Sequence, residues 1–196
     1  MATTLQPALS FPPELLQRAR GCGATPGLKA AIFDVDGVLT DGRLWISEAG
    51  EPIKAFHALD GHGLKLLARA GIVPIVITGR DSPAVRRRVA DLGLQHAHYG
   101  AHDKVAVAHE VLDRLQLNWA ELAVMGDDWP DLPLMLKAAL AVAPANAHAE
   151  VRAVAHHVSL LKGGEGAARE CCDLLLMGKG AYADALNGHL TTLDGR

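Results

Sequence analysis

Short apolar runs alternate with longer amphipathic stretches along most of the chain, and few folds are compatible with this alternation. Continuous apolar runs are typical of strands buried on both faces, and they cover 29–33, 72–77, 122–125 and 140–143. Helical spacing of apolar residues covers 63–70, 82–92, 102–115, 132–138, 147–155 and 166–177. Alternating units of this length predict an α/β fold with a doubly wound parallel sheet. In such a sheet, functional residues lie just after the carboxyl ends of strands.

The length of 196 residues suits one such domain, which we expect to span 28–177. Prolines surround a short helical stretch in 1–27, which we expect to form an N-terminal arm, and 178–196 is expected to be a C-terminal tail. After the first strand, 44–47 and 52–56 predict a β-hairpin flap around a turn at 48–51.

The composition excludes several classes of protein. A net charge of −3 argues against a dedicated nucleic-acid-binding protein, which would normally be basic. The apolar runs are far too short to span a bilayer, and the first residues lack the pattern of a signal peptide. The three cysteines are too few and too unevenly spaced for a disulfide framework, so Cys171 and Cys172 are expected to be packed thiols. We therefore expect a cytoplasmic protein without nucleic-acid or membrane partners.

Carboxylates follow two of the predicted strands. Asp34 and Asp36 come directly after 29–33. Two carboxylates this close repel one another unless they share a cation or a proton. A hard cation such as Mg²⁺ suits a site made only of oxygen ligands. After 122–125 the chain carries Asp127, Asp128 and Asp131.

Groups that suit phosphate follow the remaining strand ends. Thr78, Gly79 and Arg80 come after 72–77 and offer a hydroxyl, an amide and a guanidinium. Lys104 lies near the start of the helix predicted over 102–115, where the ammonium and the helix N-terminus both favour an anion. Each group alone is also common as a cap, a turn or a surface residue. Four of them in order, each at a strand end, indicate one shared site.

These groups resemble the four motifs of the haloacid dehalogenase-like superfamily. The matching residues are Asp34-Val-Asp-Gly-Val-Leu-Thr, Thr78-Gly-Arg, Lys104 and Gly126-Asp-Asp-x-x-Asp. Within the superfamily, 29–176 is similar to the 3-deoxy-D-manno-octulosonate 8-phosphate phosphatases. That similarity is carried by Gly50-Glu-x-x-Lys-Ala-Phe, by Asp60-Gly-x-Gly and by the glycine-rich run that begins at Gly163. It implies the superfamily's Rossmann-like fold and a Mg²⁺-dependent phosphoric monoester hydrolase.

The resemblance also implies catalytic roles. Asp34 would be the nucleophile that forms an aspartyl-phosphate, and Asp36 would be the general acid for the leaving alcohol and then the base for water. Thr78 and Lys104 would hold phosphoryl oxygens.

A metal site follows from the same resemblance. The Mg²⁺ ligands would be the Asp34 carboxylate, the main-chain carbonyl of Asp36 and Asp127. Asp128 and Asp131 would orient those ligands from behind.

A substrate pocket for the sugar acid phosphate is implied as well. Its residues would be His57, Ala58, Leu59, Asp60, Gly61, Lys65, Gly79, Arg80, Arg88 and Lys104. Leu59 stands where the family usually has a basic residue, Glu165 stands where an arginine is usual, and Lys65 replaces an arginine. Fewer cations weaken the binding of a carboxylate. A nine-carbon keto-acid 9-phosphate or another sugar phosphate therefore remains an alternative substrate.

The spacing of the motifs leaves no room for a cap domain. The stretches from Asp36 to Thr78 and from Thr78 to Lys104 are each too short to hold one. The resembled family forms tetramers in which neighbours complete the site, which implies a homotetramer here. The hairpin residues Leu44, Trp45 and Ile46 fit either such an interface or packing on the chain's own core.

Two functions of other classes stay open. A phosphoacceptor signalling module also combines carboxylates, a threonine, a lysine and Mg²⁺ on an α/β sheet. The paired Asp127 and Asp128, together with Asp36, favour the enzyme. A catalytically retired regulatory partner is compatible with Leu59 and Glu165. The pair His156 and His157 fits surface or packed positions better than a transition-metal site.

Overall fold

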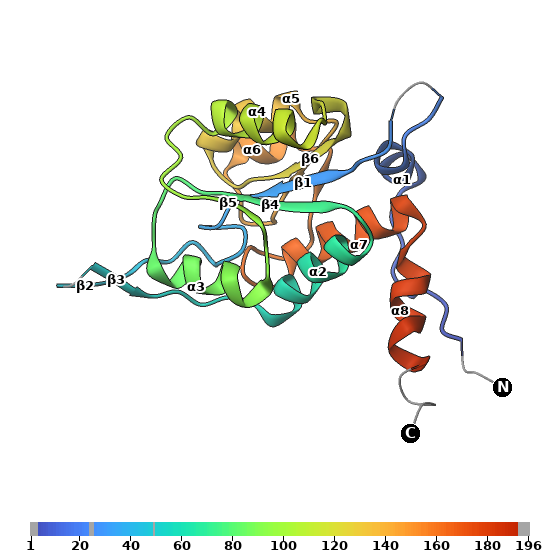
Figure 1. Cartoon of the computed structure of the whole chain (residues 1–196), viewed down its shortest axis with the longest axis horizontal. Helices are drawn as coiled ribbons and strands as arrows, with labels where there is room; N and C mark the ends of the chain where they lie inside the picture. The colour runs from blue at the N-terminus through green and yellow to red at the C-terminus, as the bar shows by residue number, and fades with distance from the viewer. Residues whose placement is uncertain (1–3, 24–25, 49, 192–196) are drawn as a thin grey trace.

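The computed structural model describes residues 4–23, 26–48 and 50–191. Six parallel strands form one sheet in the order β5-β4-β1-β6-β7-β8 (Figure 1). They are β1 (Ala30–Phe33), β4 (Val73–Ile77), β5 (His96–His98), β6 (Leu122–Met125), β7 (Leu140–Ala143) and β8 (His157–Val158). The predicted α/β fold is confirmed. Sequence reasoning missed β5 and β8, because these short edge strands carry histidines instead of a continuous apolar run.

Helices cover both faces of the sheet (Figure 1). One face carries α2 (Ala58–Arg69), α3 (Pro83–Leu92) and α7 (Ala167–Lys179). The other carries α4 (Lys104–Leu115), α5 (Leu132–Lys137) and α6 (Ala149–Val154), and two short 3-10 helices, η1 (Trp119–Glu121) and η2 (Trp129–Asp131), flank β6. Successive strand residues point to opposite faces, so Phe33 packs in the first core and Ile32 in the second. Two apolar cores therefore hold β1 rigidly at the centre.

A separate two-stranded hairpin projects from this body (Figure 1). It consists of antiparallel β2 (Trp45–Ser47) and β3 (Gly50–Ile53), so its second strand starts earlier than the predicted 52–56. The reason is a tight turn, in which Ser47 pairs directly with Gly50. Trp45 is 58% exposed and Ile46 is 72% exposed. These two side chains therefore do not pack on the core of their own chain.

Both terminal segments contain helices. In α1 (Pro13–Arg20), Leu15 and Ala19 are buried in the first core against α7. The other terminal helix is α8 (Tyr182–Thr191). Its Asn187 side chain accepts the amide N–H of Leu5 at 2.8 Å and donates to the carbonyl of Leu5. Much of the expected arm and tail is therefore packed on the domain or on each other, while 1–3, 24–25 and 192–196 lie outside the described residues. The domain boundaries at 27 and 178 stay predictions.

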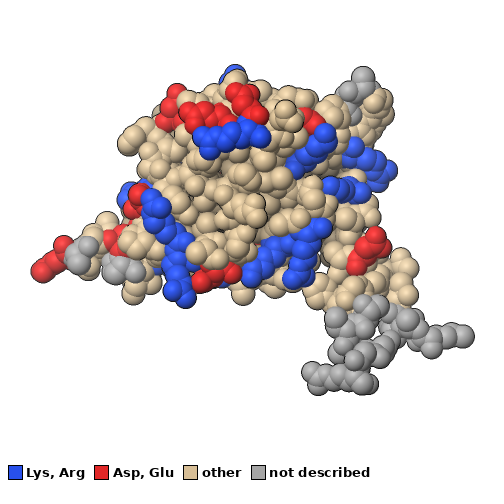
Figure 2. All heavy atoms as spheres, viewed as in Figure 1, with Lys and Arg blue, Asp and Glu red and all other residues tan. Residues whose placement is uncertain are grey.

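Other sequence expectations concern cysteines, histidines and surface charge. Cys171 and Cys172 are buried free thiols, as expected, and Cys22 is exposed. His156 accepts the amide N–H of Ala141 and His157 pairs with Glu170, so both have packed, structural partners. On the face shown in Figure 2, Lys and Arg side chains are interspersed with Asp and Glu. Within the described residues, no helix is both long and apolar enough to cross a membrane.

Candidate active site

The candidate site lies where β1, β4 and β6 end side by side. The helices that follow β1 and β4 cover one face of the sheet, and those that follow β5 and β6 cover the other. The boundary between β1 and β6 is therefore the topological switch point of the sheet. Ligands bind at such a switch point in doubly wound sheets. A cleft of about 420 Å³ opens there. It is lined by Asp34, Asp36, Gly42, Leu44, Thr78, Gly79, Arg80, Lys104, Asp127, Asp128, Pro130 and Asp131. All four motifs found in the sequence therefore meet in one place.

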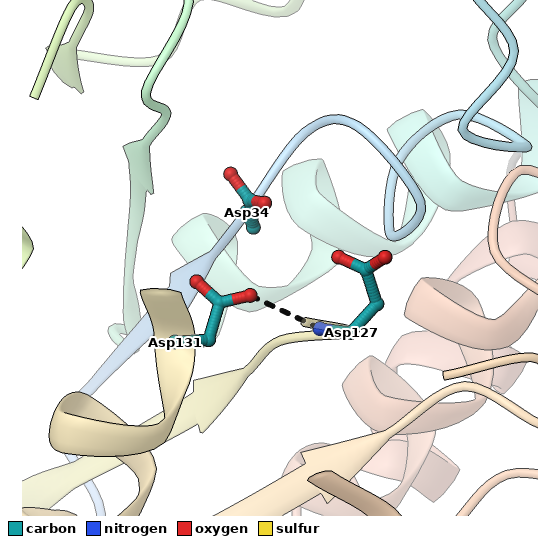
Figure 3. A group of neighbouring side chains, drawn as sticks. All are labelled: Asp34, Asp127 and Asp131. Carbon is teal, nitrogen blue, oxygen red and sulfur yellow. Dashed lines mark hydrogen bonds between the residues drawn. The ribbon is translucent and has the colours of Figure 1, made fainter. Parts of the chain in front are cut away.

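Three carboxylates from different elements converge in this cleft (Figure 3). Asp34 follows β1, Asp127 follows β6, and Asp131 ends η2. One oxygen of each lies within 4.8 Å of the others. Asp131 Oδ2 accepts the amide N–H groups of Asp127 at 3.1 Å and Asp128 at 3.4 Å. A β-carbon at Gly126 would collide with Asp131, so glycine allows this close approach.

Lys104 is the cation of the cluster. Its Nζ lies 2.7 Å from Asp131 Oδ1 and 3.0 Å from Asp34 Oδ1. The helix that presents it is capped by Asp103, whose side chain accepts the amide N–H of Ala106. Burial alone would lower the pKa of Lys104, but the carboxylates of Asp34 and Asp131 outweigh it and raise the pKa. The ammonium is therefore charged at neutral pH.

The electrostatics of the cluster fit a divalent cation. Burial, followed by the charge of Asp131, raises the pKa of Asp34 to about 6. Burial and three neighbouring carboxylates, with Asp34 the strongest, raise the pKa of Asp127 to about 8. Asp127 Oδ1 is buried without a hydrogen-bond partner among the described residues. A bound cation would give this oxygen a partner and relieve the repulsion.

The contacts of the three carboxylates indicate which of them are free to bind a metal ion and which is already engaged with the protein. Asp131 already accepts two amides and Lys104, so Asp34 and Asp127 are the carboxylates best placed to hold a metal ion. Asp131 accepts the amide N–H of Asp127, a contact that can orient Asp127; the supporting role that the resemblance implies for Asp131 stays a prediction. The Asp128 side chain is exposed, and its backbone amide donates to Asp131 Oδ2.

Asp36 lines the same cleft and is paired with two cations. Its carboxylate is paired with Lys54, and its Oδ2 lies 3.7 Å from Arg80 Nε. Thr78 is buried, and its hydroxyl accepts the amide N–H of Arg80. Sequence reasoning assigned no role to Lys54. The signal for it was the motif Gly50-Glu-x-x-Lys-Ala-Phe, in which Lys54 stands three residues after Glu51.

A glycine-rich turn fixes the loop that carries Asp34 and Asp36. The amide N–H of Gly164 donates to the carbonyl of Val38 at 3.0 Å. Gly164 has φ +67°, and a β-carbon there would lie 2.5 Å from the amide nitrogen of Asp41. A β-carbon at Gly163 would overlap the carbonyl oxygen of Gly37. Only glycines at these positions let the turn close on the loop after β1.

Most of the predicted substrate residues lie outside the cleft of their own chain. His57 precedes α2, and Ala58, Leu59 and Gly61 form its first turn, because α2 begins five residues earlier than the predicted 63. Arg88 of α3 donates to the carbonyl of His57 at 3.4 Å.

Asp60 and Lys65 are likewise away from the cleft. The buried carboxylate of Asp60 accepts the amide N–H of Arg169 at 2.8 Å and so caps α7; burial raises its pKa. Lys65 lines a different cavity of about 370 Å³ beside the amino ends of β4 and β5. Their roles in substrate binding stay predictions.

Comparisons with known proteins agree with this geometry. A family model described as haloacid dehalogenase-like hydrolase matches residues 99–170. The 3-deoxy-D-manno-octulosonate 8-phosphate phosphatase of Yersinia pestis is 39% identical over 164 residues, which is 84% of either chain.

Solved structures give the same result. The phosphatase of this name from Moraxella catarrhalis, in complex with magnesium, phosphate and KDO, has a TM-score of 0.82 at 34% identity and covers 90% of this chain and 97% of its own. The cobalt-bound deoxy-D-mannose-octulosonate 8-phosphate phosphatase from Haemophilus influenzae has a TM-score of 0.78 at 38% identity, covering 81% of this chain and 96% of its own. The fold, the convergent motifs and these relatives lead to one conclusion: the chain belongs to the 3-deoxy-D-manno-octulosonate 8-phosphate phosphatase family of the haloacid dehalogenase-like hydrolases.

Proposed function

We propose that this protein is a Mg²⁺-dependent phosphatase that hydrolyses 3-deoxy-D-manno-octulosonate 8-phosphate to the free sugar acid and phosphate. The observation that carries the proposal is the convergence of Asp34, Asp127 and Asp131 around Lys104, with Asp36 in the same cleft. The substrate named for the relatives from Yersinia pestis and Moraxella catarrhalis supports the choice of sugar acid.

In the first half-reaction, a carboxylate oxygen of Asp34 attacks phosphorus, and the bond from phosphorus to the sugar oxygen breaks. Asp36, in its protonated form, donates its proton to that leaving oxygen. Mg²⁺, held by Asp34, Asp127 and the carbonyl of Asp36, would neutralise charge on the phosphoryl group. Lys104 and Thr78 hold phosphoryl oxygens, and the Lys104 charge offsets that of the attacking carboxylate.

In the second half-reaction, water attacks the phosphorus of the aspartyl-phosphate. Asp36 takes a proton from this water, the bond from phosphorus to the Asp34 oxygen breaks, and inorganic phosphate leaves. Asp36 is then protonated again for the next substrate. One carboxyl group thus serves both steps, which requires that its position in the cleft be fixed.

We also propose that the working enzyme is a homotetramer. Trp45, Ile46 and Ile53 on the projecting hairpin are 58%, 72% and 63% exposed, an apolar surface that suits burial against other copies of the chain. Neighbouring chains would then supply the substrate residues that lie outside the cleft of their own chain.

The test is Mg²⁺-dependent phosphate release from the eight-carbon acid, a nine-carbon keto-acid 9-phosphate and simple hexose phosphates. We expect preference for the eight-carbon acid and loss of activity with a chelator. Preference for the nine-carbon acid would instead support the alternative that rests on Leu59, which is 53% exposed, and on Glu165. Stable phosphorylation of Asp34 without turnover would indicate a signalling module. No release from any ester would indicate a retired partner.

A further inference from the structure

Lys54 is a buried cation at the base of the hairpin. It follows β3 directly, and its side chain is 0% exposed, although Ile53 before it is 63% exposed. A buried ammonium is costly unless it is paired. Lys54 is paired twice, with the Asp36 carboxylate and with Glu51 Oε1 at 2.7 Å. The lysine therefore joins β3 to the loop that follows β1.

The Asp36 carboxylate has one buried partner and one exposed partner. Lys54 is enclosed by protein, whereas the Arg80 side chain is 54% exposed and its Nε is 3.7 Å from Asp36. An exposed, long pair of this kind contributes little to holding a geometry. The orientation of Asp36, whose side chain is 20% exposed, is therefore set mainly by Lys54.

Among the residues that the structure describes, the hairpin shares no strand pairing with the main sheet. Its base is joined to the loop that follows β1 through Glu51, Lys54 and Asp36. A displacement of the hairpin would move Lys54, and with it the carboxylate of Asp36. Seating of the hairpin is thus linked to the position of the group that transfers protons in the proposed mechanism.

We propose that Lys54 is a positioning residue that holds Asp36 where it can protonate the leaving oxygen and so couples hairpin seating to proton transfer. The inference rests on the proposed function. Its signature is a dependence on the leaving group. An alkoxide must be protonated as it leaves, whereas p-nitrophenolate leaves without a proton. Loss of Lys54 should therefore slow the hydrolysis of alkyl phosphate esters more than that of p-nitrophenyl phosphate.

The experiment compares Lys54→Met with wild type on benzyl phosphate and p-nitrophenyl phosphate, two esters of similar size, with Mg²⁺ present. The measured quantity is kcat/KM, which reports the first half-reaction. We expect kcat/KM for benzyl phosphate to fall about 10- to 100-fold and that for p-nitrophenyl phosphate to stay within about threefold. Lys54→Gln, a shorter neutral side chain, is the second variant, and Lys137→Met at the exposed end of α5 is the control. Thermal unfolding of each variant establishes that it is folded.

Either folded variant decides the question. An equal loss on both esters, or no loss on benzyl phosphate, would overturn the positioning role and leave Lys54 as a structural residue. A wild-type enzyme that hydrolyses neither ester nor any sugar phosphate would refute the proposed function itself. That failure is visible before any variant is compared.

Discussion

Replacing Gly164 by alanine should displace the loop that carries Asp34 and Asp36, although Gly164 does not itself line the cleft. The added β-carbon would lie 2.5 Å from the amide nitrogen of Asp41 and 2.9 Å from the α-carbon of Thr40, whereas ordinary contacts are 3.4 Å or longer. The backbone of the loop after β1 would have to withdraw by about 0.5–1 Å. Alanine at φ +67° also costs about 1–2 kcal/mol. With about 1–3 kcal/mol for overpacking, the expected loss of unfolding free energy is roughly 2–5 kcal/mol.

Gly93→Ala provides the matched control. Gly93 has φ +71°, and an added β-carbon there meets nothing within 4 Å, so this variant carries the same backbone strain without the collision. Thermal unfolding should place the melting temperature of Gly164→Ala below that of Gly93→Ala, because each kcal/mol shifts the melting temperature by about 2–4 °C in a chain of this size. Phosphatase assays should show kcat/KM falling about 100-fold for Gly164→Ala alone, since a displacement of about 1 Å near the proposed nucleophile has this effect.

Two outcomes would refute this reasoning. If Gly164→Ala kept its kcat/KM within about threefold of Gly93→Ala, the contact with the loop after β1 would not position Asp34 and Asp36. If the two variants unfolded at the same temperature, the collision would be relieved without cost. A crystal structure of Gly164→Ala would then show where the loop had moved.

Three further predictions follow from the described contacts. Asp34→Asn should abolish turnover while circular dichroism and the melting temperature stay near those of wild type; surviving activity would contradict its assignment as nucleophile. Ellman's reagent should label Cys22 rapidly in the native protein, and Cys171 and Cys172 only in denaturant, because burial raises the pKa of both buried thiols and excludes the reagent; three fast thiols would contradict this. Burial alone would raise the pKa of Glu170, but hydrogen bonds with His157 and Ser159 hold it below its usual value. Ionised Glu170 therefore stabilises the folded protein at pH values above its pKa in the unfolded chain, and this stabilisation is lost as the pH falls through its pKa in the folded protein. The free energy of unfolding in urea should therefore differ more between wild type and Glu170→Gln at neutral pH than in acid. A difference independent of pH would contradict this.

The sequence was sufficient for the fold class and for the four motifs, because buried parallel strands carry continuous apolar runs and the acidic groups stand directly after them. β5 was missed because a strand at the edge of a sheet needs no continuous apolar run, and His96 and His98 are only half-buried. The start of α2 was placed too late because its first turn breaks the usual pattern: Leu59 is exposed, whereas Asp60 is buried against α7.

The candidate site could be predicted to the extent that it depends on strand ends. The residues that follow β1, β4 and β6 meet because parallel strands end at the same edge. Lys54 could not be placed, because its position depends on how the hairpin folds back, and spacing along the chain does not determine that. The same holds for His57 and Arg88, which contact one another between α2 and α3 instead of lining the cleft.

The closure of Gly164 on Val38 joins residues from opposite ends of the domain. Contacts between distant residues form late, because the intervening chain must first be ordered. During synthesis, Asp34 and Asp36 leave the ribosome early. The turn at Gly163 and Gly164, which fixes their loop, is synthesised only after β8. Until that turn forms, the nascent chain therefore carries the two carboxylates proposed for catalysis without the geometry that the proposed mechanism needs. Catalytic competence should arise in one late step, when the segment from Gly163 to α7 docks.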